Sequence, residues 1–327
     1  MHVNRMKSVQ TCSYGLSMAA ESPTIQLNDG SKIPVVALGT GRGTSKGANI
    51  EEVRDAVLWA IEAGYRHIDT AAIYGDEPQV GQGLADAIAK GVVKREDVFV
   101  TTKIWNDKHH REQVVPELKE SLKRLGLDYV DLYLIHFPVA SKPDGSPDNV
   151  DYLETWQGME DAKEQGLTKS IGISNFNVTQ LDRLMANSKV KPAVNQIEVN
   201  PTLTQELLVS HCKKLGVAVM AYSPFGFLVT RKHHMAPSPR YDDPILRKMA
   251  EKYGKTTGQI VLRYLIDRGL IIIPKSTNKE RIGQNIDIFD FKLTDEEIKV
   301  IGNYNKNVRV INPIAWKDYP NYPFERD

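Results

Sequence analysis

The sequence has little cysteine and no long apolar segment, and both absences narrow the class of protein. Cys12 and Cys212, without a Cys-x-x-Cys pair, provide neither a disulfide framework nor a cysteine-based zinc site, so a reducing compartment, the cytoplasm, is expected. No apolar run approaches the length of a membrane span, so no membrane partner is predicted. Residues 1–20 have a polar middle that does not suit a signal peptide, and secretion is not expected.

The chain also lacks an excess of either charge. Its 327 residues include 42 basic and 41 acidic side chains, a formal net charge of +1. No global field therefore favours nucleic acid, and any anion site must be local. No linker rich in glycine, serine or proline divides the chain, so we expect a single domain over residues 23–327, a flexible extension over residues 1–22, and a monomer.

Three catalytic patterns are missing. The loop that begins at Gly39 lacks the complete Gly-x-Gly-x-x-Gly of a Rossmann dinucleotide site. No Tyr-x-x-x-Lys occurs among the 13 tyrosines, which argues against short-chain dehydrogenase chemistry. The predicted strand ends mostly carry histidine, lysine, tyrosine or serine, whereas a barrel glycosidase requires paired carboxylates.

Two pairs of histidines, His109 with His110 and His233 with His234, lie in predicted loops. Neither pair has Cys, Asp or Glu ligands at metal spacing. We therefore expect these histidines to be solvated, and no metal site is predicted.

Short buried strands alternate with amphipathic helices through most of the chain. Each parallel strand needs a crossover helix, and eight such units over about 250 residues suit a closed α/β barrel, the (β/α)8 TIM barrel, with an open doubly wound sheet as the rival. A β-hairpin with Asp29 and Gly30 in its turn precedes the first unit. The predicted strands are residues 35–38, 67–68, 98–102, 130–135, 170–173, 193–199, 218–221 and 271–273.

Helical periodicity fills the segments between these strands. Three loops exceed the usual connection length, namely residues 137–149, residues 225–243 and the long C-terminal loop from residue 305, and long loops are where selectivity is expected. The predicted helices are residues 50–63, 79–90, 111–125, 151–164, 178–186, 204–215, 244–253, 257–267, 279–286 and 295–303.

Polar residues follow several of the predicted strands, at the end where such folds place their chemistry. Asp69, Lys103 and His136 come after three strands, and Tyr74 follows closely on the first of them. An ammonium lowers the pKa of a nearby phenol, so Lys103 is expected to prepare Tyr74 as a general acid, with Asp69 as the counter-charge and His136 orienting a carbonyl oxygen. The structural alternative is a buried Asp-Lys pair beside a core histidine.

A second group of polar residues joins the last predicted strand to a helix start. Lys275, Ser276, Thr277 and Arg281 offer cations and hydroxyls beside free helix N–H groups, an arrangement suited to the 2′-phosphate of NADPH or NADP+. The alternative is an ordinary charged loop and helix cap. Elsewhere, Tyr222, at a strand end, is expected to stack on a nicotinamide ring, and Ser174, Asn175 and Gln196 are expected to hydrogen-bond the carboxamide of that ring. The alternative is that Tyr222 only packs against its neighbours.

From about Thr24 to its C-terminus, the chain resembles the aldo-keto reductases. The resemblance rests on residues 64–74, 102–105, 134–136, 171–176, 195–196, 222–224 and 273–276, with Arg281 and Asn285. It implies an NADPH-dependent carbonyl reductase in a (β/α)8 barrel, acting on a small-molecule carbonyl substrate. It implies Tyr74 as the proton donor, tuned by Lys103 and Asp69, with His136 orienting the substrate. The cofactor contacts that it implies are Gly39, Thr40, Gly41, Asp69, Ser174, Asn175, Gln196, Tyr222, Ser223, Phe225, Lys275, Ser276, Thr277, Arg281, Gln284 and Asn285.

The substrate pocket departs from the pattern of many relatives at two positions. Gly41 and Phe137 stand where many aldo-keto reductases have tryptophan, so a narrow aromatic slot is expected to be wider here and to admit a bulky ketone. The expected substrate-binding residues are Tyr74, Trp105, His136, Phe137, Ile311 and Trp316.

The amino-acid sequence of residues 37–43 and 317–320 is similar to that of insect aldo-keto reductases, among them the 3-dehydroecdysone 3β-reductases. A steroid ketone is therefore one expected substrate. The alternatives are broad reduction of toxic aldehydes and a non-catalytic subunit that senses a cofactor or associates with a channel.

Overall fold

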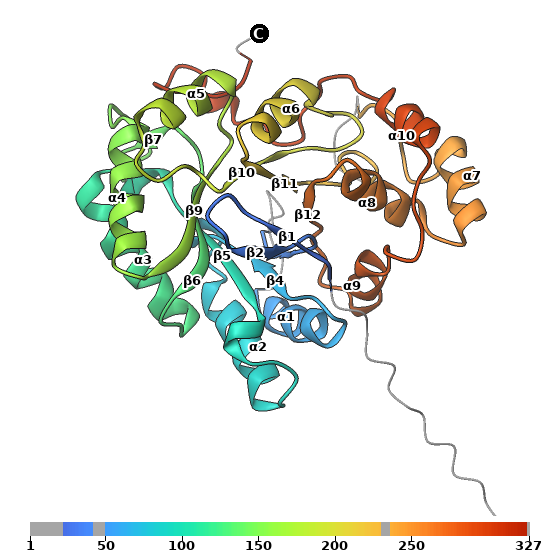
Figure 1. The fold of residues 1–327 in the computed structure, drawn as a ribbon, viewed down its shortest axis with the longest axis horizontal. Coiled ribbons are helices and arrows are strands. Elements are labelled where there is room, and N and C mark those ends of the chain that lie inside the picture. The colour runs from blue at the N-terminus through green and yellow to red at the C-terminus, as the bar shows by residue number, and fades with distance from the viewer. Residues whose placement is uncertain (1–21, 42–49, 230–235, 326–327) are drawn as a thin grey trace, which may run out of the picture.

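The computed structural model describes residues 22–41, 50–229 and 236–325, and the predicted extension over residues 1–22 lies outside them except for Ser22. The described residues form one central sheet of eight parallel strands, surrounded by helices (Figure 1). Neighbours in the sheet follow the order of the chain. The strands are β3 Leu38–Gly39, β4 His67–Asp69, β5 Phe99–Ile104, β6 Val130–Ile135, β9 Thr168–Ser174, β10 Val194–Glu198, β11 Ala218–Tyr222 and β12 Ile271–Ile273.

The first and last strands of the sheet meet. Val36 and Gly39 form parallel bridges with Ile272 and Lys275. The amide of Ala37 donates to the carbonyl of Ile272 at 2.9 Å. The sheet is therefore closed into a barrel, the (β/α)8 prediction is confirmed, and the open-sheet alternative is wrong. Because this closure uses isolated bridges, β3 is shorter than the predicted strand 35–38 and lies closer to the barrel mouth.

Helices alternate with these strands, and their buried residues pack on the outside of the barrel. Their bounds lie within about two residues of those predicted, the usual uncertainty at helix ends. One difference has a clear cause, because α6 begins after Gln205, whose positive φ of 51° interrupts the predicted helix. The helices are α1 Glu52–Glu62, α2 Glu77–Ala89, α3 Arg111–Leu125, α4 Tyr152–Glu164, α5 Val178–Asn187, α6 Glu206–Lys214, α7 Pro244–Tyr253, α8 Thr257–Asp267, α9 Lys279–Ile286 and α10 Asp295–Gly302.

The predicted N-terminal hairpin is present and closes one end of the barrel. Strands β1 Thr24–Gln26 and β2 Lys32–Pro34 pair antiparallel around a turn in which Gly30 has a φ of 89°. Leu27 and Ile33 are buried in a cluster with the barrel residues Ala37 and Phe99. With this end covered, the carboxyl ends of the strands are left to form the site.

The long loop after β6 contains a short hairpin that the sequence did not predict, β7 Ala140–Ser141 with β8 Pro147–Asp148. Such two-residue strands carry no detectable periodicity. Four 3-10 turns, η1 Ala72–Tyr74, η2 Arg95–Asp97, η3 Asn106–Lys108 and η4 Ile314–Trp316, complete the described elements.

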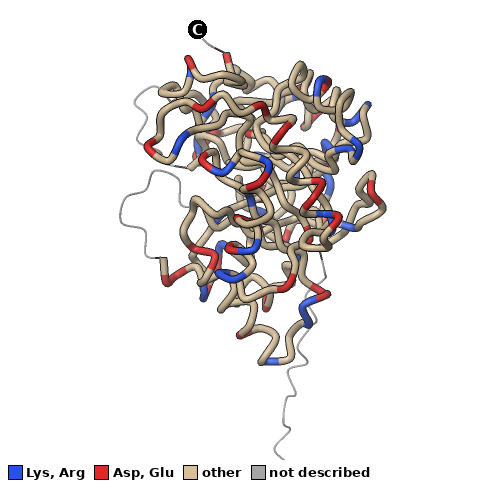
Figure 2. Tube along the Cα trace, turned by 90° about the vertical axis from the view of Figure 1, so that its left-hand side faces the viewer, with Lys and Arg blue, Asp and Glu red and all other residues tan. Residues whose placement is uncertain are grey.

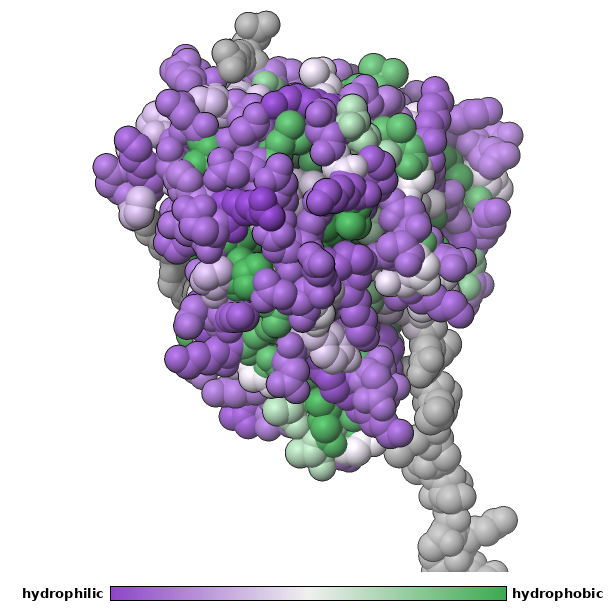
Figure 3. All heavy atoms as spheres, turned by 60° about the vertical axis from the view of Figure 1, so that its left-hand side comes forward, coloured by the Kyte–Doolittle hydropathy of each residue, from purple (hydrophilic) through white to green (hydrophobic). Residues whose placement is uncertain are grey.

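The described surface is mixed in character. Basic and acidic residues are interspersed along the chain (Figure 2), as the near balance of charge predicts. The face in Figure 3 is mostly hydrophilic, with small separate apolar areas. Among the described residues, no helix is long and apolar enough to cross a membrane.

Candidate active site

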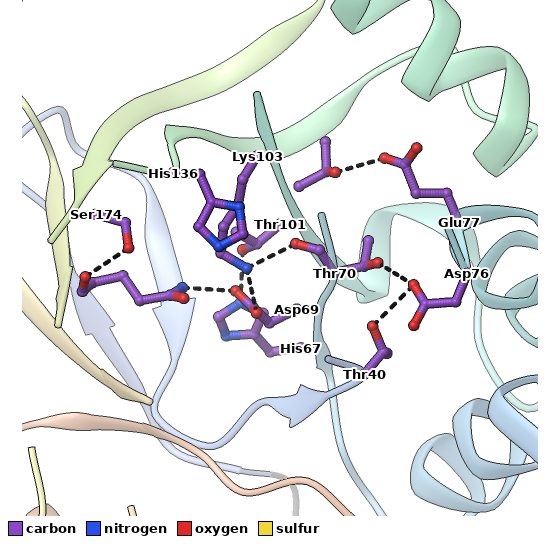
Figure 4. Close-up of polar contacts among 12 residues, drawn as sticks. Thr40, His67, Asp69, Thr70, Asp76, Glu77, Thr101, Lys103, His136 and Ser174 are labelled. Atoms are coloured by element: carbon purple, nitrogen blue, oxygen red, sulfur yellow. Dashed lines mark hydrogen bonds and ion pairs between the residues drawn. The ribbon is translucent and has the colours of Figure 1, made fainter. Parts of the chain in front are cut away.

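Lys103 and Asp69 form a buried ion pair at the centre of the barrel mouth (Figure 4). Lys103, near the end of β5, is fully buried and donates to Asp69 Oδ1 at 2.7 Å and to the carbonyl of Thr70 at 2.8 Å. The second carboxylate oxygen, Oδ2, accepts from Gln196 Nε2 at 2.7 Å. Both oxygens of Asp69 are therefore occupied by donors, which fixes the carboxylate and, through it, the ammonium.

Tyr74 lies next to this pair. It ends the turn η1, and Gly75 follows in the left-handed conformation with a φ of 68°. The Lys103 ammonium lies 5.0 Å from the centroid of the Tyr74 ring. Gly41 lies close against the phenol: a Cβ at this position would lie 3.0 Å from Tyr74 Cζ and 3.3 Å from its hydroxyl oxygen, which is tighter than an ordinary contact.

His136 completes the group, directly after β6. Its ring centroid lies 5.6 Å from that of Tyr74, with the two planes at 81°. Trp105 packs edge-on at 5.0 Å and Phe137 stacks at 5.4 Å. The structure thus brings all four residues of the predicted catalytic group together, from three strand ends and one turn.

The electrostatics of the group agree with the predictions in part. Burial has the largest effect on the pKa of Lys103 and lowers it, but the charges and hydrogen bonds of Asp69 and Tyr74 together outweigh burial, so the pKa is raised and the lysine stays charged. Burial raises the pKa of Tyr74, and the charge and hydrogen bond of Lys103 oppose this without reversing it. The predicted lowering of the Tyr74 pKa below its ordinary value is therefore wrong in this structure, although Lys103 acts in the predicted direction.

His136 is only 8% exposed, and burial, with the charge of Lys103, holds its pKa well below the ordinary value. A neutral imidazole carries one N–H and accepts at its other nitrogen. His136 is therefore suited to donate a hydrogen bond to a carbonyl oxygen while remaining neutral across the physiological pH range.

A supporting group behind the site was missed by the sequence reasoning. Asp76 is fully buried, and its Oδ1 accepts from Thr70 at 2.7 Å and from Thr40 at 3.3 Å (Figure 4). Its neighbour Glu77 accepts from Thr102 at 2.6 Å. These contacts tie the loop after β3 to the loop that carries Tyr74. The sequence offered one possible signal of this group, namely two adjacent acids, Asp76 and Glu77, directly after Gly75. Acidic residues are seldom buried unless they have partners, so a buried pair indicates a hydrogen-bonded role.

The predicted nicotinamide contacts are linked to one another. Ser174 donates to the carbonyl of Gln196 at 2.8 Å, and Asn175 donates to the carbonyl of His136 at 2.9 Å. Tyr222 donates its hydroxyl hydrogen to Asn175 Oδ1 at 2.7 Å. Asn175 and Ser223 adopt positive φ angles of 63° and 47°. The structure therefore gathers these residues beside the catalytic group, with the ring of Tyr222 half-buried at the mouth.

The predicted phosphate contacts lie where β12 leads into α9. Lys275 and Arg281 are exposed cations, and Ser276 between them is buried. Arg281 Nε lies 3.5 Å from Ser276 Oγ, and Asn278 caps the helix by accepting from the Arg281 amide at 3.0 Å. Thr277 and Gln284 are half-buried, and Asn285 is buried. The cations and the start of α9 thus occupy one region, as expected.

Of the predicted cofactor residues, Gly39 ends β3, Thr40 and Gly41 follow it, and Phe225 is half-buried after β11. Thr40 is buried and engaged with Asp76. Residues 42–49 and 230–235 fall outside the described part of the chain, so the predicted long loop 225–243 lies partly outside it too.

Aromatic side chains form one wall beside His136. Trp316, from the C-terminal tail, lies 5.8 Å from Trp105 and 5.2 Å from Phe137 between ring centroids. Phe324 approaches Phe137 at 6.4 Å. Ile311, also predicted to bind substrate, is half-buried in the tail. The tail therefore reaches the neighbours of His136, as the sequence predicted.

The prediction for the first histidine pair is wrong for His109. This residue is 1% exposed rather than solvated, and it lies in the segment that joins β5 to α3, where its carbonyl accepts from Thr155 of α4. His110 is half-exposed, and its ring lies 3.3 Å from Asp148. His110, Glu112 and Glu154 bring potential metal-ligand atoms within 4.8 Å of one another, so acidic groups do accompany this histidine in space. His233 and His234 lie outside the described residues.

Comparison with known proteins identifies the family. The Bombyx mori aldo-keto reductase AKR2E4 is 70% identical over 307 residues, covering 94% of this chain and 100% of the relative. Its crystal structure in complex with NADP matches at a TM-score of 0.92 with 69% identity, over 94% of this chain and 100% of that chain. The NADPH complex of silkworm AKR2E5 matches at a TM-score of 0.91 with 45% identity, over 93% and 94% of the two chains.

Mouse estradiol 17 beta-dehydrogenase 5 is a more distant relative, 41% identical over 321 residues that cover 94% of this chain and 99% of the relative. Residues 35–306 match the profile of the Aldo/keto reductase family. The resemblance seen in the sequence is thus confirmed, and the chain belongs to the aldo/keto reductase family.

Proposed function

We propose that this protein uses NADPH to reduce an aldehyde or ketone to the corresponding alcohol. The observation that carries the proposal is the contact between the charged Lys103, held by Asp69, and the phenol of Tyr74, beside a neutral His136. A proton donor, a cation that stabilises its conjugate base and a hydrogen-bond donor for a carbonyl oxygen are the groups that this reduction requires.

The residues at the barrel mouth fit the cofactor. Lys275 and Arg281 are exposed cations beside the start of α9, where a phosphate group is favoured both by charge and by free helix N–H groups. Tyr222 offers a half-buried ring, and Ser174 and Asn175 offer polar groups close to it. Silkworm relatives of this chain have been solved with NADP and NADPH, which supports the same cofactor here.

The cofactor, when bound, supplies a hydride to the carbonyl carbon. Tyr74 donates its hydroxyl proton to the carbonyl oxygen as the C=O bond becomes a C–OH bond. Lys103 lies against the phenol and stabilises the phenolate that remains. Asp69 keeps Lys103 charged and in place. His136 donates an N–H hydrogen bond that orients the carbonyl oxygen toward Tyr74.

Tyr74→Phe tests this assignment. The variant keeps the ring over which Lys103 lies but removes the proton, so kcat should fall by about 10²- to 10⁴-fold while the Kd for NADPH stays within about twofold. Tyr253→Phe, which removes a hydroxyl at the protein surface, is the control. Full turnover by Tyr74→Phe would refute Tyr74 as the acid. A separate alternative is that the protein is a non-catalytic subunit, and oxidation of NADPH by the unaltered protein in the presence of a carbonyl substrate would exclude it.

For the substrate, we propose a bulky ketone, with the steroid ketone 3-dehydroecdysone as the first candidate. The aromatic wall of Trp105, Phe137 and Trp316 supports an apolar pocket, and the lack of a side chain at Gly41, next to the Tyr74 ring, supports a wide one. The name of the related mouse estradiol dehydrogenase indicates that a relative acts on a steroid.

The competing proposal is broad reduction of small aldehydes, which the same tetrad would catalyse. A panel of 3-dehydroecdysone, simple aldehydes and hexoses, ranked by kcat/KM with NADPH, separates the two. A preference for the steroid by about tenfold or more supports the first, and a flat ranking supports the second. We further propose a monomeric cytoplasmic enzyme, which the scarcity of cysteine supports.

A further inference from the structure

The C-terminal tail runs along the rim of the barrel mouth and is fastened at both ends. Figure 1 shows it leaving α10 and passing α6 toward α5. At its start, the carbonyl of Thr202 accepts from the amides of Lys306 and Val308 at 3.1 and 3.2 Å. At its end, Asn177 and Gln180, at the start of α5, donate to the carbonyls of Pro323 and Asn321 at 3.2 and 2.8 Å. The segment between these points carries the aromatic wall.

A buried carboxylate holds the tail between these two points. Glu198, the last residue of β10, is 1% exposed. Its Oε1 accepts from the amide of Val310 at 2.7 Å and its Oε2 from the amide of Ile311 at 2.9 Å. Asn200 donates to the same Oε1 at 3.0 Å. One rigid strand end thus binds two consecutive backbone amides that lie more than 100 residues further along the chain.

Among the residues that the structure describes, no cation forms an ion pair with this carboxylate. The charge of Arg309 acts to lower the pKa of Glu198. The Arg309 guanidinium itself, however, pairs with Glu325 at 3.0 Å and lies 4.2 Å from the centroid of the Phe324 ring. Burial raises the pKa of Glu198, and the two tail amides are the first groups that oppose this effect. The buried carboxylate therefore needs the hydrogen bonds of the tail amides, and the tail is held in position by the same two bonds.

The amides held by Glu198 immediately precede the substrate wall. Ile311 is itself a predicted wall residue, and Trp316 follows five residues later, against Trp105 and Phe137. Both of these rings pack on His136. Displacement of residues 310 and 311 would thus shift Trp316 relative to the histidine that orients the carbonyl oxygen.

We infer that Glu198 is a positioning residue for substrate selection: it fixes the tail so that Trp316 closes the pocket around a large substrate. This inference rests on the proposed carbonyl reduction and deepens it. Glu198 takes no part in proton or hydride transfer, so a small aldehyde that does not reach the wall is reduced equally well without it.

Glu198→Gln in the full-length protein tests the inference. The amide keeps the shape of the side chain but presents an NH2 group to one of the two tail amides, so one bond is lost. We expect the ratio of kcat/KM for 3-dehydroecdysone to that for glyceraldehyde to fall by about tenfold, mainly through KM of the steroid. The Kd for NADPH and kcat for glyceraldehyde should stay within about twofold.

Glu296→Gln is the matched control, because it removes the same charge from an exposed position in the first turn of α10. It should leave the ratio unchanged. Equal losses for both substrates in Glu198→Gln, or a parallel loss of NADPH binding, would overturn the inference and assign Glu198 to general stability of the barrel.

Hydrogen exchange in the unaltered protein provides a test that needs neither a folded variant nor activity. The amides of Val310 and Ile311 should exchange more slowly than that of the exposed Asn312 next to them. Equal rates would show that Glu198 does not hold the tail and would end the inference. If the two amides are protected but no carbonyl is reduced, the proposed reaction fails while the fastening of the tail stands.

Discussion

The side-chain amide of Gln196 donates a 2.7 Å hydrogen bond to Asp69 Oδ2, although 127 residues separate the two in the chain. Asp69 ends β4 and Gln196 lies on β10, so the bond crosses the barrel mouth. Lys103 occupies the other carboxylate oxygen. Gln196 therefore shares in holding the charged pair, in addition to the cofactor contact that the sequence predicted for it.

Removal of this amide should destabilise the protein. Gln196→Leu would leave Asp69 Oδ2 buried without its donor, at a cost of about 1–3 kcal/mol in the free energy of unfolding. Urea denaturation measures the change. Gln157→Leu, at an exposed position on α4, serves as the control and should change the free energy by no more than about 0.5 kcal/mol. Equal values for the two variants would mean that the bond across the mouth adds nothing measurable.

The proposed phosphate site makes a prediction about cofactor choice. Replacing both Lys275 and Arg281 with alanine should raise the Kd for NADPH by about 100-fold or more, because charge-assisted hydrogen bonds to a phosphate contribute about 1.5–3 kcal/mol each. NADH lacks the 2′-phosphate, so its Kd should change by no more than about threefold. Fluorescence titration with each nucleotide gives both constants.

Lys292→Ala is the control for this pair, since it removes an exposed cation that precedes α10. If the double variant weakened NADPH and NADH equally, the two cations would bind a part of the nucleotide that both forms share. The 2′-phosphate would then have to be bound elsewhere.

The fold and the catalytic group followed from one physical rule. Eight buried runs alternate with amphipathic helices, which requires parallel strands, and parallel strands place residues such as Asp69, Lys103 and His136 at one end of a barrel. Their meeting could be predicted without knowledge of any side-chain angle. The short strands β7 and β8 could not be predicted, because two residues are too few to show a hydrophobic periodicity.

Effects of burial were beyond the sequence. Whether Lys103 lowers the pKa of Tyr74 enough to overcome desolvation depends on how much water reaches the phenol, which sequence patterns do not report. His109 was taken as solvated because it lies in a polar loop, yet that loop is covered. The fastening of residues 310 and 311 by Glu198 uses backbone amides, which every residue except proline has, so no residue type marks it.

The buried histidines predict a loss of stability in mild acid. Burial lowers the pKa of His67 from 6.5 to about 4 and that of His109 from 6.5 to about 3. In the unfolded chain both bind protons as the pH falls through about 6.5, whereas in the folded protein they stay neutral. Stability should therefore fall between pH 6.5 and pH 4, by about 2 kcal/mol for each of the two at pH 5.

His109→Leu isolates one of these contributions, because neither ring nitrogen of His109 has a hydrogen-bond partner among the described residues. Urea denaturation at pH 7 and pH 5 should show a difference between the two conditions that is smaller by about 2 kcal/mol in this variant than in the unaltered protein. An unchanged difference would mean that His109 titrates alike in both states and is accessible to water.

The absence of a side chain at Gly41 makes the last prediction, on substrate size. A Cβ at this position would already lie 3.0 Å from Tyr74 Cζ, so Gly41→Val would place its bulk against the phenol, where the substrate carbonyl is proposed to bind. We expect kcat/KM for 3-dehydroecdysone to fall about tenfold more than that for glyceraldehyde, since only the larger substrate needs this space. Gly302→Ala, where the nearest atom would lie 3.7 Å from the new Cβ, is the control. A uniform loss for both substrates would instead mean that the valine displaces Tyr74 itself, and the width of the pocket would then have to come from Phe137 and the tail.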